Sequence, residues 1–417
     1  MATAPTAGGW SYKQNWLYPP YSQSALAHTN ATYREFASRN GNCSRSSSWR
    51  YGWLGANGHS AYYLSGEQLA KLVPANERIA LMGDSLFGQL ETSWRARLYE
   101  SCGGCSGGRS QQLTWCSWYN LLPFVAANGA TPLIERLRSR NPPEATECGL
   151  EWASPGASRA TVAHHLRWDY HLALMDRSEY LNCARSSSVV LVNAFLHLGI
   201  FIEGLQRQYK RCGGAAASDA AAVASRAVGD ALELWALSLN ESAAALATLR
   251  ASGVSVYYVL SQPPATLFCR EDAAAVPRRE EAWGPAHGVL ATRSCAAPLS
   301  LQAYNRLQAA PDHEIARLSS SHAAYHHDLW REVNRMSEHA FAAHGHGILR
   351  WQQAFRGTRV DAHPGSTPGS TRPDMEHFCM PGVPDLELDV LLNSLYLPAA
   401  GRNADHHSKT GPRRDGG

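Results

Sequence analysis

The sequence contains no long hydrophobic run and almost no excess of charge of one sign. No apolar stretch reaches the roughly eighteen residues that a membrane-spanning helix needs, so neither a transmembrane helix nor a membrane anchor is visible in the chain. Basic residues number 38 and acidic residues 35, which leaves a formal net charge of +3. This balance gives no reason to expect nucleic acid or anionic lipid as a partner.

Targeting and metal-binding motifs are also missing. The start, MATAPTAGGWSYKQNW, has neither the basic residues nor the apolar block of a signal peptide. CGGC at 102–105 is not accompanied by the second Cys-x-x-Cys of a zinc ribbon, and HEIAR at 313–317 lacks the second histidine of a zincin. His322 and His326 are better explained as part of a solvated polar face, so no metal site is expected.

The cysteines point to an oxidising compartment. Ten of them are spread along the chain, and an even, scattered set is typical of disulfide-bonded proteins. We therefore interpret 102–105 as a disulfide-closed loop. Three Asn-x-Ser/Thr sequons, at Asn30, Asn42 and Asn240, agree with passage through the secretory pathway.

Short apolar runs alternate with helical patterns along the chain. A composition of 44% hydrophobic and 18% charged residues is that of a soluble globular protein. The runs predict strands, and the three-to-four spacing predicts helices. The strands are expected at 78–82, 188–192, 254–260 and 347–351, and the helices at 86–98, 215–250 and 312–343. Such alternation predicts an α/β fold with a parallel sheet covered by helices on both faces.

Ser85 lies at a favourable place in this predicted fold. It follows the first strand within Gly83-Asp84-Ser85 and begins the next helix. Ligands of parallel sheets bind beyond the carboxyl ends of the strands, and the N–H groups at a helix start stabilise a developing oxyanion. Ser85 is therefore a candidate nucleophile.

A serine nucleophile needs a base and an acid that orients the base. Asp374 and His377 stand three residues apart, just before a Pro-Gly-Val-Pro turn and an apolar helix. This spacing lets the carboxylate reach the imidazole within one loop and fix its tautomer. The other ring nitrogen is then free to take the proton of Ser85.

The two motifs together resemble a known family. Residues 83–86, GDSL, and residues 374–385, DMEHFCMPGVPD, resemble the paired blocks of the PC-esterase family. Its plant members are the trichome-birefringence-like polysaccharide O-acetyltransferases, with an SGNH-hydrolase-like fold. Weaker similarities lie at 190–193, 261–264 and 359–364, and the resemblance spans about residues 43–398.

The resemblance implies the roles of the candidate residues. Ser85 is the expected nucleophile, His377 the base and Asp374 its orienting acid. Asn193 and the backbone N–H of Ser85 are expected in the oxyanion hole. The family's arginine after the GDSL block is absent here, and Gln89 either replaces it as a donor or simply packs.

Four further residues are candidates for contacts with substrate. Asp84 belongs to the GDSL block, and Arg359, Asp361 and His363 form a block that resembles the family's R-x-D-x-H-P motif. Two interpretations of the latter block remain open. These side chains either make structural contacts near the site or line a groove for a glycan.

The expected protein is a single PC-esterase-like domain over residues 43–398, and its expected fold is an SGNH-hydrolase-like three-layer sandwich. A partly irregular N-terminal segment, 1–42, is expected before this domain, and a disordered tail, 399–417, is expected after it. The resemblance implies an O-acetyltransferase of polysaccharide or glycan hydroxyls, working through an acyl-Ser85 intermediate in the Golgi. No cofactor is expected, and an acetyl donor is the co-substrate. The alternatives are an acetyl-esterase with the same triad and a glycan-binding protein without turnover.

Overall fold

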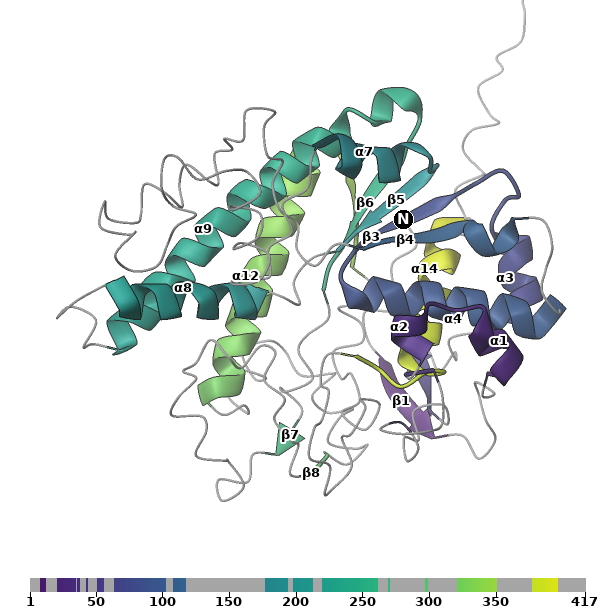
Figure 1. Cartoon of the computed structure of the whole chain (residues 1–417), viewed down its shortest axis with the longest axis horizontal. Coiled ribbons are helices and arrows are strands. Elements are labelled where there is room, and N and C mark those ends of the chain that lie inside the picture. Colours follow the sequence, from purple (N-terminus) through teal and green to yellow (C-terminus); the bar gives the residue numbers. More distant parts are fainter. Residues whose placement is uncertain are drawn as a thin grey trace, which may run out of the picture.

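A computed structural model gives the fold of the chain (Figure 1). It describes residues 8–12, 21–34, 36–37, 43, 51–55, 64–102, 108–117, 177–193, 198–212, 220–261, 269–270, 297–298, 321–350 and 377–396.

The centre of the molecule is a five-stranded parallel sheet. Its strands are β3 (Ile79–Gly83), β4 (Leu113–Ser117), β5 (Val189–Val192), β6 (Ser255–Val259) and β9 (Gly347–Leu349). Their order across the sheet is β4-β3-β5-β6-β9, and every neighbouring pair is parallel. The chain thus adds its second strand on one side of β3 and the later strands on the other. The order therefore reverses at β3, which is where doubly wound sheets bind their ligands.

The two faces of the sheet divide the core into two parts. All five residues of β3 are buried, and successive side chains of a strand point to opposite faces. Ala80 and Met82 belong to one hydrophobic cluster, whereas Ile79 and Leu81 belong to the other. Burial on both faces explains why β3 and β5 are continuous apolar runs rather than alternating ones.

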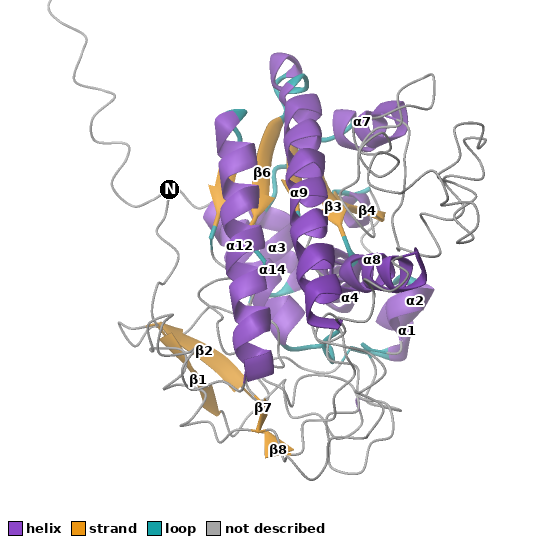
Figure 2. Cartoon of the chain, turned by 90° about the vertical axis from the view of Figure 1, so that its left-hand side faces the viewer, coloured by secondary structure: helices purple, strands orange, loops and turns teal. Residues whose placement is uncertain are grey.

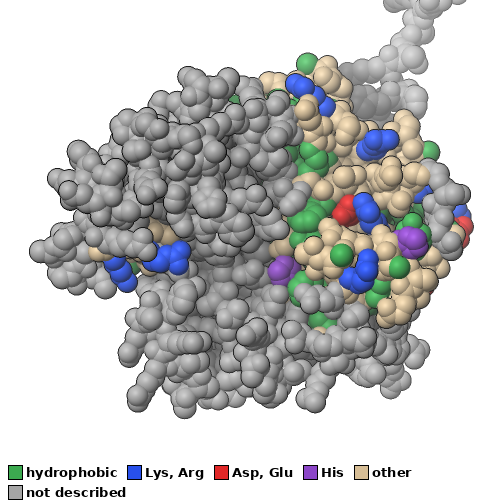
Figure 3. Space-filling model, in the orientation of Figure 1, with side chains coloured by type: hydrophobic (Ala, Val, Ile, Leu, Met, Phe, Trp, Pro, Cys, Tyr) green, Lys and Arg blue, Asp and Glu red, His purple; other side chains and the backbone are tan. Residues whose placement is uncertain are grey.

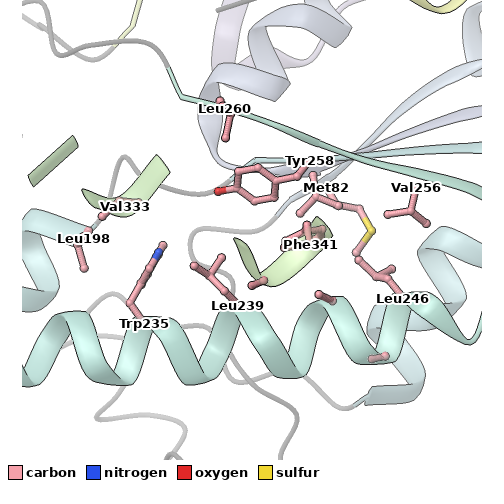
Figure 4. Packing of buried hydrophobic residues seen from close by; sticks show 14 of the residues in the cluster. Met82, Leu198, Trp235, Leu239, Leu246, Val256, Tyr258, Leu260, Val333 and Phe341 are labelled. Atoms are coloured by element: carbon pink, nitrogen blue, oxygen red, sulfur yellow. The ribbon is translucent and has the colours of Figure 1, made fainter. Parts of the chain in front are cut away.

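One face is covered by α7 (Arg177–Arg185), α8 (Leu198–Cys212), α9 (Ala220–Ala247) and α12 (Ser321–Ala343). In Figure 2, α9 and α12 stand side by side in front of the strands. Although α9 is rich in alanine, a few large side chains along it pack against the sheet. Figure 4 shows Leu239 and Leu246 pointing toward Tyr258 and Met82, and all four side chains are fully buried.

The opposite face is covered by α3 (Gly66–Leu72), α4 (Ser85–Cys102) and α14 (Val383–Tyr396) (Figure 1). The short α3 begins with a capping box, in which the side chains of Ser65 and Gln68 each bond the other's backbone N–H. The C-terminal helix α14 packs on α4 and α3, and most of it is buried. The end of the chain therefore forms part of the core on the side where Ser85 lies.

The N-terminal part packs on the same helical layer. α1 (Gln23–Ala27) and α2 (Ala31–Arg34) contact α4. Two antiparallel ribbons and two 3₁₀ turns complete the described elements. These are β1 (Gly8–Tyr12) with β2 (Tyr51–Gly55), β7 (Cys269–Arg270) with β8 (Ala297–Pro298), η3 (Arg109–Gln111) and η7 (Arg250–Ser252).

Two disulfide bonds between described residues join distant parts of the fold. Cys43 is bonded to Cys379, across 336 residues of sequence, and Cys116 is bonded to Cys183. The first ties the N-terminal part to the loop before α14, and the second ties β4 to α7. Such bonds agree with the oxidising, secretory-type compartment expected from the cysteine pattern. Within the described residues, no helix has the length and apolarity to cross a membrane.

The predicted α/β class is confirmed, and the four predicted strands correspond to β3, β5, β6 and β9. The helix predicted over 215–250 is described from Ala220 to Ala247, and the one predicted over 312–343 is described from Ser321 to Ala343. The sequence prediction missed β4 and α8. The predicted tail, 399–417, lies outside the described residues.

Candidate active site

Ser85 is the first residue of α4, directly beyond the carboxyl end of β3. Asp84 caps this helix, because its Oδ1 accepts the N–H of Leu86 (3.0 Å) and its carbonyl accepts the N–H of Phe87 (3.1 Å). Ser85 is 6% exposed, and no hydrogen-bond partner of its Oγ is found among the described residues. The helix start thus presents a buried hydroxyl whose described surroundings leave it available for chemistry.

The glycine before this turn permits a close approach of two strand ends. A Cβ at Gly83 would lie 2.8 Å from the carbonyl oxygen of Asn193 and 2.8 Å from the ring of Phe87. Any larger residue would push β5 away from the start of α4. Gly83 therefore sets the distance between Ser85 and the end of β5.

Asn193 lies at the end of β5, on the same sheet edge as Ser85. Its side chain is buried, and its Nδ2 donates to the carbonyl of Val259 (2.7 Å) and to Oγ of Ser261 (3.1 Å). An amide has two N–H bonds, and both are directed at the end of β6 here. The structure therefore gives Asn193 a role in joining β5 to β6, and its role as an oxyanion donor stays a prediction.

Four polar residues form a buried stripe along α4, with one residue in each turn. Ser85, Gln89, Ser93 and Arg97 are four residues apart, so they share one face of the helix. Their exposed fractions are 6%, 0%, 0% and 1%. We call these four residues the polar stripe. Buried polar side chains need hydrogen-bond partners, and the described partners of the stripe come chiefly from residues 378–389.

Gln89 holds the backbone next to His377. Its Nε2 donates to the carbonyl of Phe378 (2.7 Å), and the N–H of Phe378 donates to its Oε1 (3.0 Å). These two bonds span 289 residues of sequence and fix the backbone beside the imidazole. The sequence left Gln89 open between an oxyanion donor and a packing residue. The structure shows a residue that positions the His377 loop, and its donor role stays a prediction.

Asp385 of α14 lies beside Ser93, the third residue of the stripe, and accepts several hydrogen bonds. Its Oδ1 accepts from Ser93 Oγ (2.7 Å) and from the hydroxyl of Tyr21, and its Oδ2 accepts the N–H of Gly382 (2.8 Å). Arg97 lies 4.0 Å from this carboxylate. Asp385 therefore anchors the turn after His377, a role that the sequence did not assign.

Arg97 closes the stripe with a buried ion pair. Its guanidinium lies 2.8 Å from Asp389 of α14 and also donates to the carbonyls of Leu64 and Asp385. Burial raises the pKa of Asp389 above its ordinary value, and the Arg97 guanidinium opposes part of that rise. The stripe thus contacts Phe378, Asp385 and Asp389 in the order of the chain.

His377 itself is half-buried and packed against aromatic rings. Phe36 stacks on the imidazole with ring centroids 4.8 Å apart and planes 15° apart, and Tyr33 lies 6.1 Å away. The remaining predicted site residues, Asp374, Arg359, Asp361 and His363, lie outside the described residues.

Gly88 lies one turn after Ser85 on α4, and Tyr33 fills the space beside it. A Cβ at Gly88 would lie 2.8 Å from Cζ and 3.0 Å from the hydroxyl oxygen of Tyr33, which is 2% exposed. The ring of Tyr33 also packs edge-on against Trp115, 5.3 Å away. An aromatic side chain from the N-terminal part therefore packs directly on the first turns of α4.

Gly88→Ala is expected to destabilise the protein by about 1–3 kcal/mol, because the added methyl overlaps a ring that is packed in place. Urea unfolding measures the change. Gly229→Ala is the matched control, since a Cβ there meets nothing within 4 Å, and it should stabilise α9 by about 0.5–1 kcal/mol. Equal effects of the two substitutions would contradict the packing of Tyr33 over Gly88.

A second buried carboxyl lies close to the Ser85 turn. Glu387 of α14 is 2% exposed, and no hydrogen-bond partner of its Oε1 is found within the described part of the chain. Burial raises the pKa of Glu387 to about 8, and the neighbouring carboxylate of Asp84 contributes to the rise. Glu387 is therefore largely protonated at neutral pH.

Glu387→Gln is expected to raise the free energy of unfolding above pH 8 by a few kcal/mol. The folded-state pKa is raised from an ordinary value of 4.5 to about 8, so wild type loses stability from this group as the pH rises across that interval. Glutamine removes the ionisation, and the gain should vanish near pH 4. Urea unfolding at pH 4, 6 and 9 measures this. Glu67→Gln, an exposed carboxyl on α3, should show no such alkaline gain. A variant no more stable than wild type at pH 9 would contradict the assignment.

In Figure 3, the Lys and Arg side chains on the visible described surface are scattered among neutral groups rather than gathered in one patch. Among the described residues, no cluster of three or more His, Cys, Asp or Glu side chains is placed to hold a metal ion.

No protein-family model, curated protein or solved structure matches this chain.

Proposed function

We propose that the protein is a serine-dependent O-acetyltransferase that acts on polysaccharide or glycan hydroxyls within an SGNH-hydrolase-like sandwich. The observation that carries the proposal is the polar stripe of α4. It begins with the buried hydroxyl of Ser85, and its next member, Gln89, binds the backbone beside His377 through two hydrogen bonds. These two bonds tie the segment that resembles the second PC-esterase block to the helix that begins with Ser85.

In the first half of the proposed reaction, Ser85 Oγ attacks the carbonyl carbon of the acetyl donor while His377 takes the serine proton. The negative charge that forms on the carbonyl oxygen lies at the start of an 18-residue helix, where the backbone N–H of Ser85 and the helix dipole stabilise it. Collapse of the tetrahedral intermediate breaks the bond to the donor. The leaving group departs with the proton from His377, and acetyl-Ser85 remains.

In the second half, a sugar hydroxyl attacks the acetyl-Ser85 carbonyl. His377 takes the proton of that hydroxyl and returns it to Ser85 Oγ as the acyl bond breaks, so the enzyme is restored and the sugar is acetylated. Asp374 orients the imidazole and stabilises its charged form. The acceptor would be a polysaccharide met in the secretory pathway, in keeping with the disulfides Cys43–Cys379 and Cys116–Cys183. The Golgi is the proposed compartment.

The experiment is a product analysis of the full chain made in an oxidising host. The protein is incubated with an activated acetyl ester, with and without a xylo-oligosaccharide, and acetate and acetylated sugar are separated by mass spectrometry. Acetylated oligosaccharide in excess of the uncatalysed reaction is the expected result. Acetate as the sole product would assign an acetyl-esterase instead. Retained binding of the oligosaccharide without either product would assign a glycan-binding protein.

A further inference from the structure

The segment that contains α2 and Phe36 is tied to the His377 loop by three separate contacts. The N–H of Met380 donates to the carbonyl of Phe36 (2.7 Å). The disulfide of Cys43 and Cys379 fastens the chain a few residues further on. The third contact is the stack of Phe36 on the imidazole of His377, with ring centroids 4.8 Å apart. The N-terminal part thus touches the candidate base directly.

The geometry of the stack determines what it can do. The planes of Phe36 and His377 are 15° apart, so the phenyl ring covers one face of the imidazole. A covered face blocks rotation about χ2, which would swing the ring out of its plane, and the phenyl ring itself occupies neither in-plane nitrogen. A hydrogen bond to one nitrogen fixes the tautomer but leaves the ring free to tilt about that bond, whereas a stacked ring opposes the tilt.

Tyr33 adds a second wall to this arrangement. Its ring lies 6.1 Å from that of His377 and 6.3 Å from that of Phe36. It is also pressed against Gly88, which lies one turn after Ser85 on α4. The phenol thus bridges the base and the helix that carries the nucleophile. A shift of α4 would therefore move the Tyr33 ring against the two stacked rings.

We propose that Phe36, supported by Tyr33, is a positioning residue that holds the imidazole plane of His377 toward Ser85. The catalytic consequence rests on the proposed function, because it assumes that His377 serves as the base. The fixing of the ring by the stack does not, since it concerns the contact of Phe36 with the imidazole in the resting protein.

The first arm of the test is structural and uses the full chain with ¹⁵N- and ¹³C-labelled histidine. Stacking on a phenyl ring displaces the resonances of the His377 ring protons upfield. Phe36→Leu should return them toward the values of an unstacked imidazole, whereas Phe36→Tyr should leave them close to wild type. His377→Asn identifies the signal. Unchanged His377 resonances in Phe36→Leu would overturn the proposal.

The second arm is kinetic and separates positioning from folding. Phe36→Leu should lower kcat by about 10-fold or more with little change in KM, because small misplacements of a catalytic group are costly. It should also change the acid limb of the pH profile of kcat/KM, which reports the essential base. Phe36→Tyr should restore both. Unfolding midpoints are compared, so that a loss of folded protein is not mistaken for a loss of rate.

The matched control is a second histidine stack on the same helical layer. Tyr99 of α4 stacks on His28, with centroids 3.8 Å apart and planes 4° apart, near the other end of α4 from Ser85. Tyr99→Leu should leave kcat and the His377 resonances unchanged. An equal fall in kcat for both leucine variants would overturn the proposal. A wild type without acetyl turnover would refute the proposed function, and the resonances of His377 would then decide the positioning by themselves.

Discussion

Replacing Asp385 with alanine is expected to lower the free energy of unfolding by about 3–5 kcal/mol, the range for removing one partner of a buried ionic network. The side chain is fully buried, and its carboxylate accepts hydrogen bonds from Ser93 Oγ (2.7 Å) and from the N–H of Gly382 (2.8 Å). Without it, the N–H of Gly382 loses its described acceptor inside the core, the hydroxyl of Tyr21 loses the shorter of its two hydrogen bonds, and Arg97 loses one neighbouring carboxylate while keeping that of Asp389.

Urea unfolding at pH 7 measures this loss. Asp385→Asn keeps the shape and one acceptor oxygen, so it should be destabilised less than Asp385→Ala. Glu67→Ala is the control, because it removes a carboxylate from an exposed ion pair with Lys71, and such pairs contribute little. An Asp385→Ala variant as stable as the Glu67→Ala variant would show that the network does not hold α14 to α4.

Ser85→Ala is expected to lower kcat for acetyl transfer by about 10⁴-fold or more, since loss of a nucleophile removes the covalent route. His377→Ala should have a loss of similar size, because base and nucleophile act as one unit. The double variant should be no worse than either single one. Steady-state rates with an activated acetyl ester check all three.

The matched control is Ser93→Ala. Ser93 is a fully buried serine on the same face of α4, two turns from Ser85, and its hydroxyl bonds Asp385. Its loss should lower stability but leave kcat within a few-fold of wild type. Additive losses for Ser85→Ala and His377→Ala would contradict a shared proton transfer. Comparable losses for Ser85→Ala and Ser93→Ala would show that the effect comes from the helix rather than from the nucleophile.

The fold could be predicted where local pattern and burial agree. The apolar runs of β3, β5, β6 and β9 are buried by helices, so their composition carries the signal. β4 was missed because Leu113-Thr-Trp-Cys-Ser117 is short and mixed in polarity, and its pairing with β3 decides its structure. α8 was missed because the run 189–202 looks like one buried stretch, although β5 ends within it and a helix begins at Leu198.

The candidate site could be predicted in part for a similar reason. Ser85 and His377 were found from short motifs, whereas the contacts that bring their segments together link residues about 290 apart, such as Gln89 with Phe378 and Ser93 with Asp385. A signal for the polar stripe was present, since four polar residues recur every fourth position in α4. No local pattern marks Phe36, because an aromatic residue near a short helix is equally expected in the core.

The most direct measurement of the central claim is peptide mass spectrometry of the protein after brief exposure to an activated acetyl ester. The account predicts one acetyl group on the peptide that contains Ser85. The label should be absent from Ser85→Ala, retained in Ser93→Ala, and discharged when a xylo-oligosaccharide is added. Wild-type protein without this adduct, or with equal labelling in Ser85→Ala, would contradict the claim that Ser85 is the nucleophile.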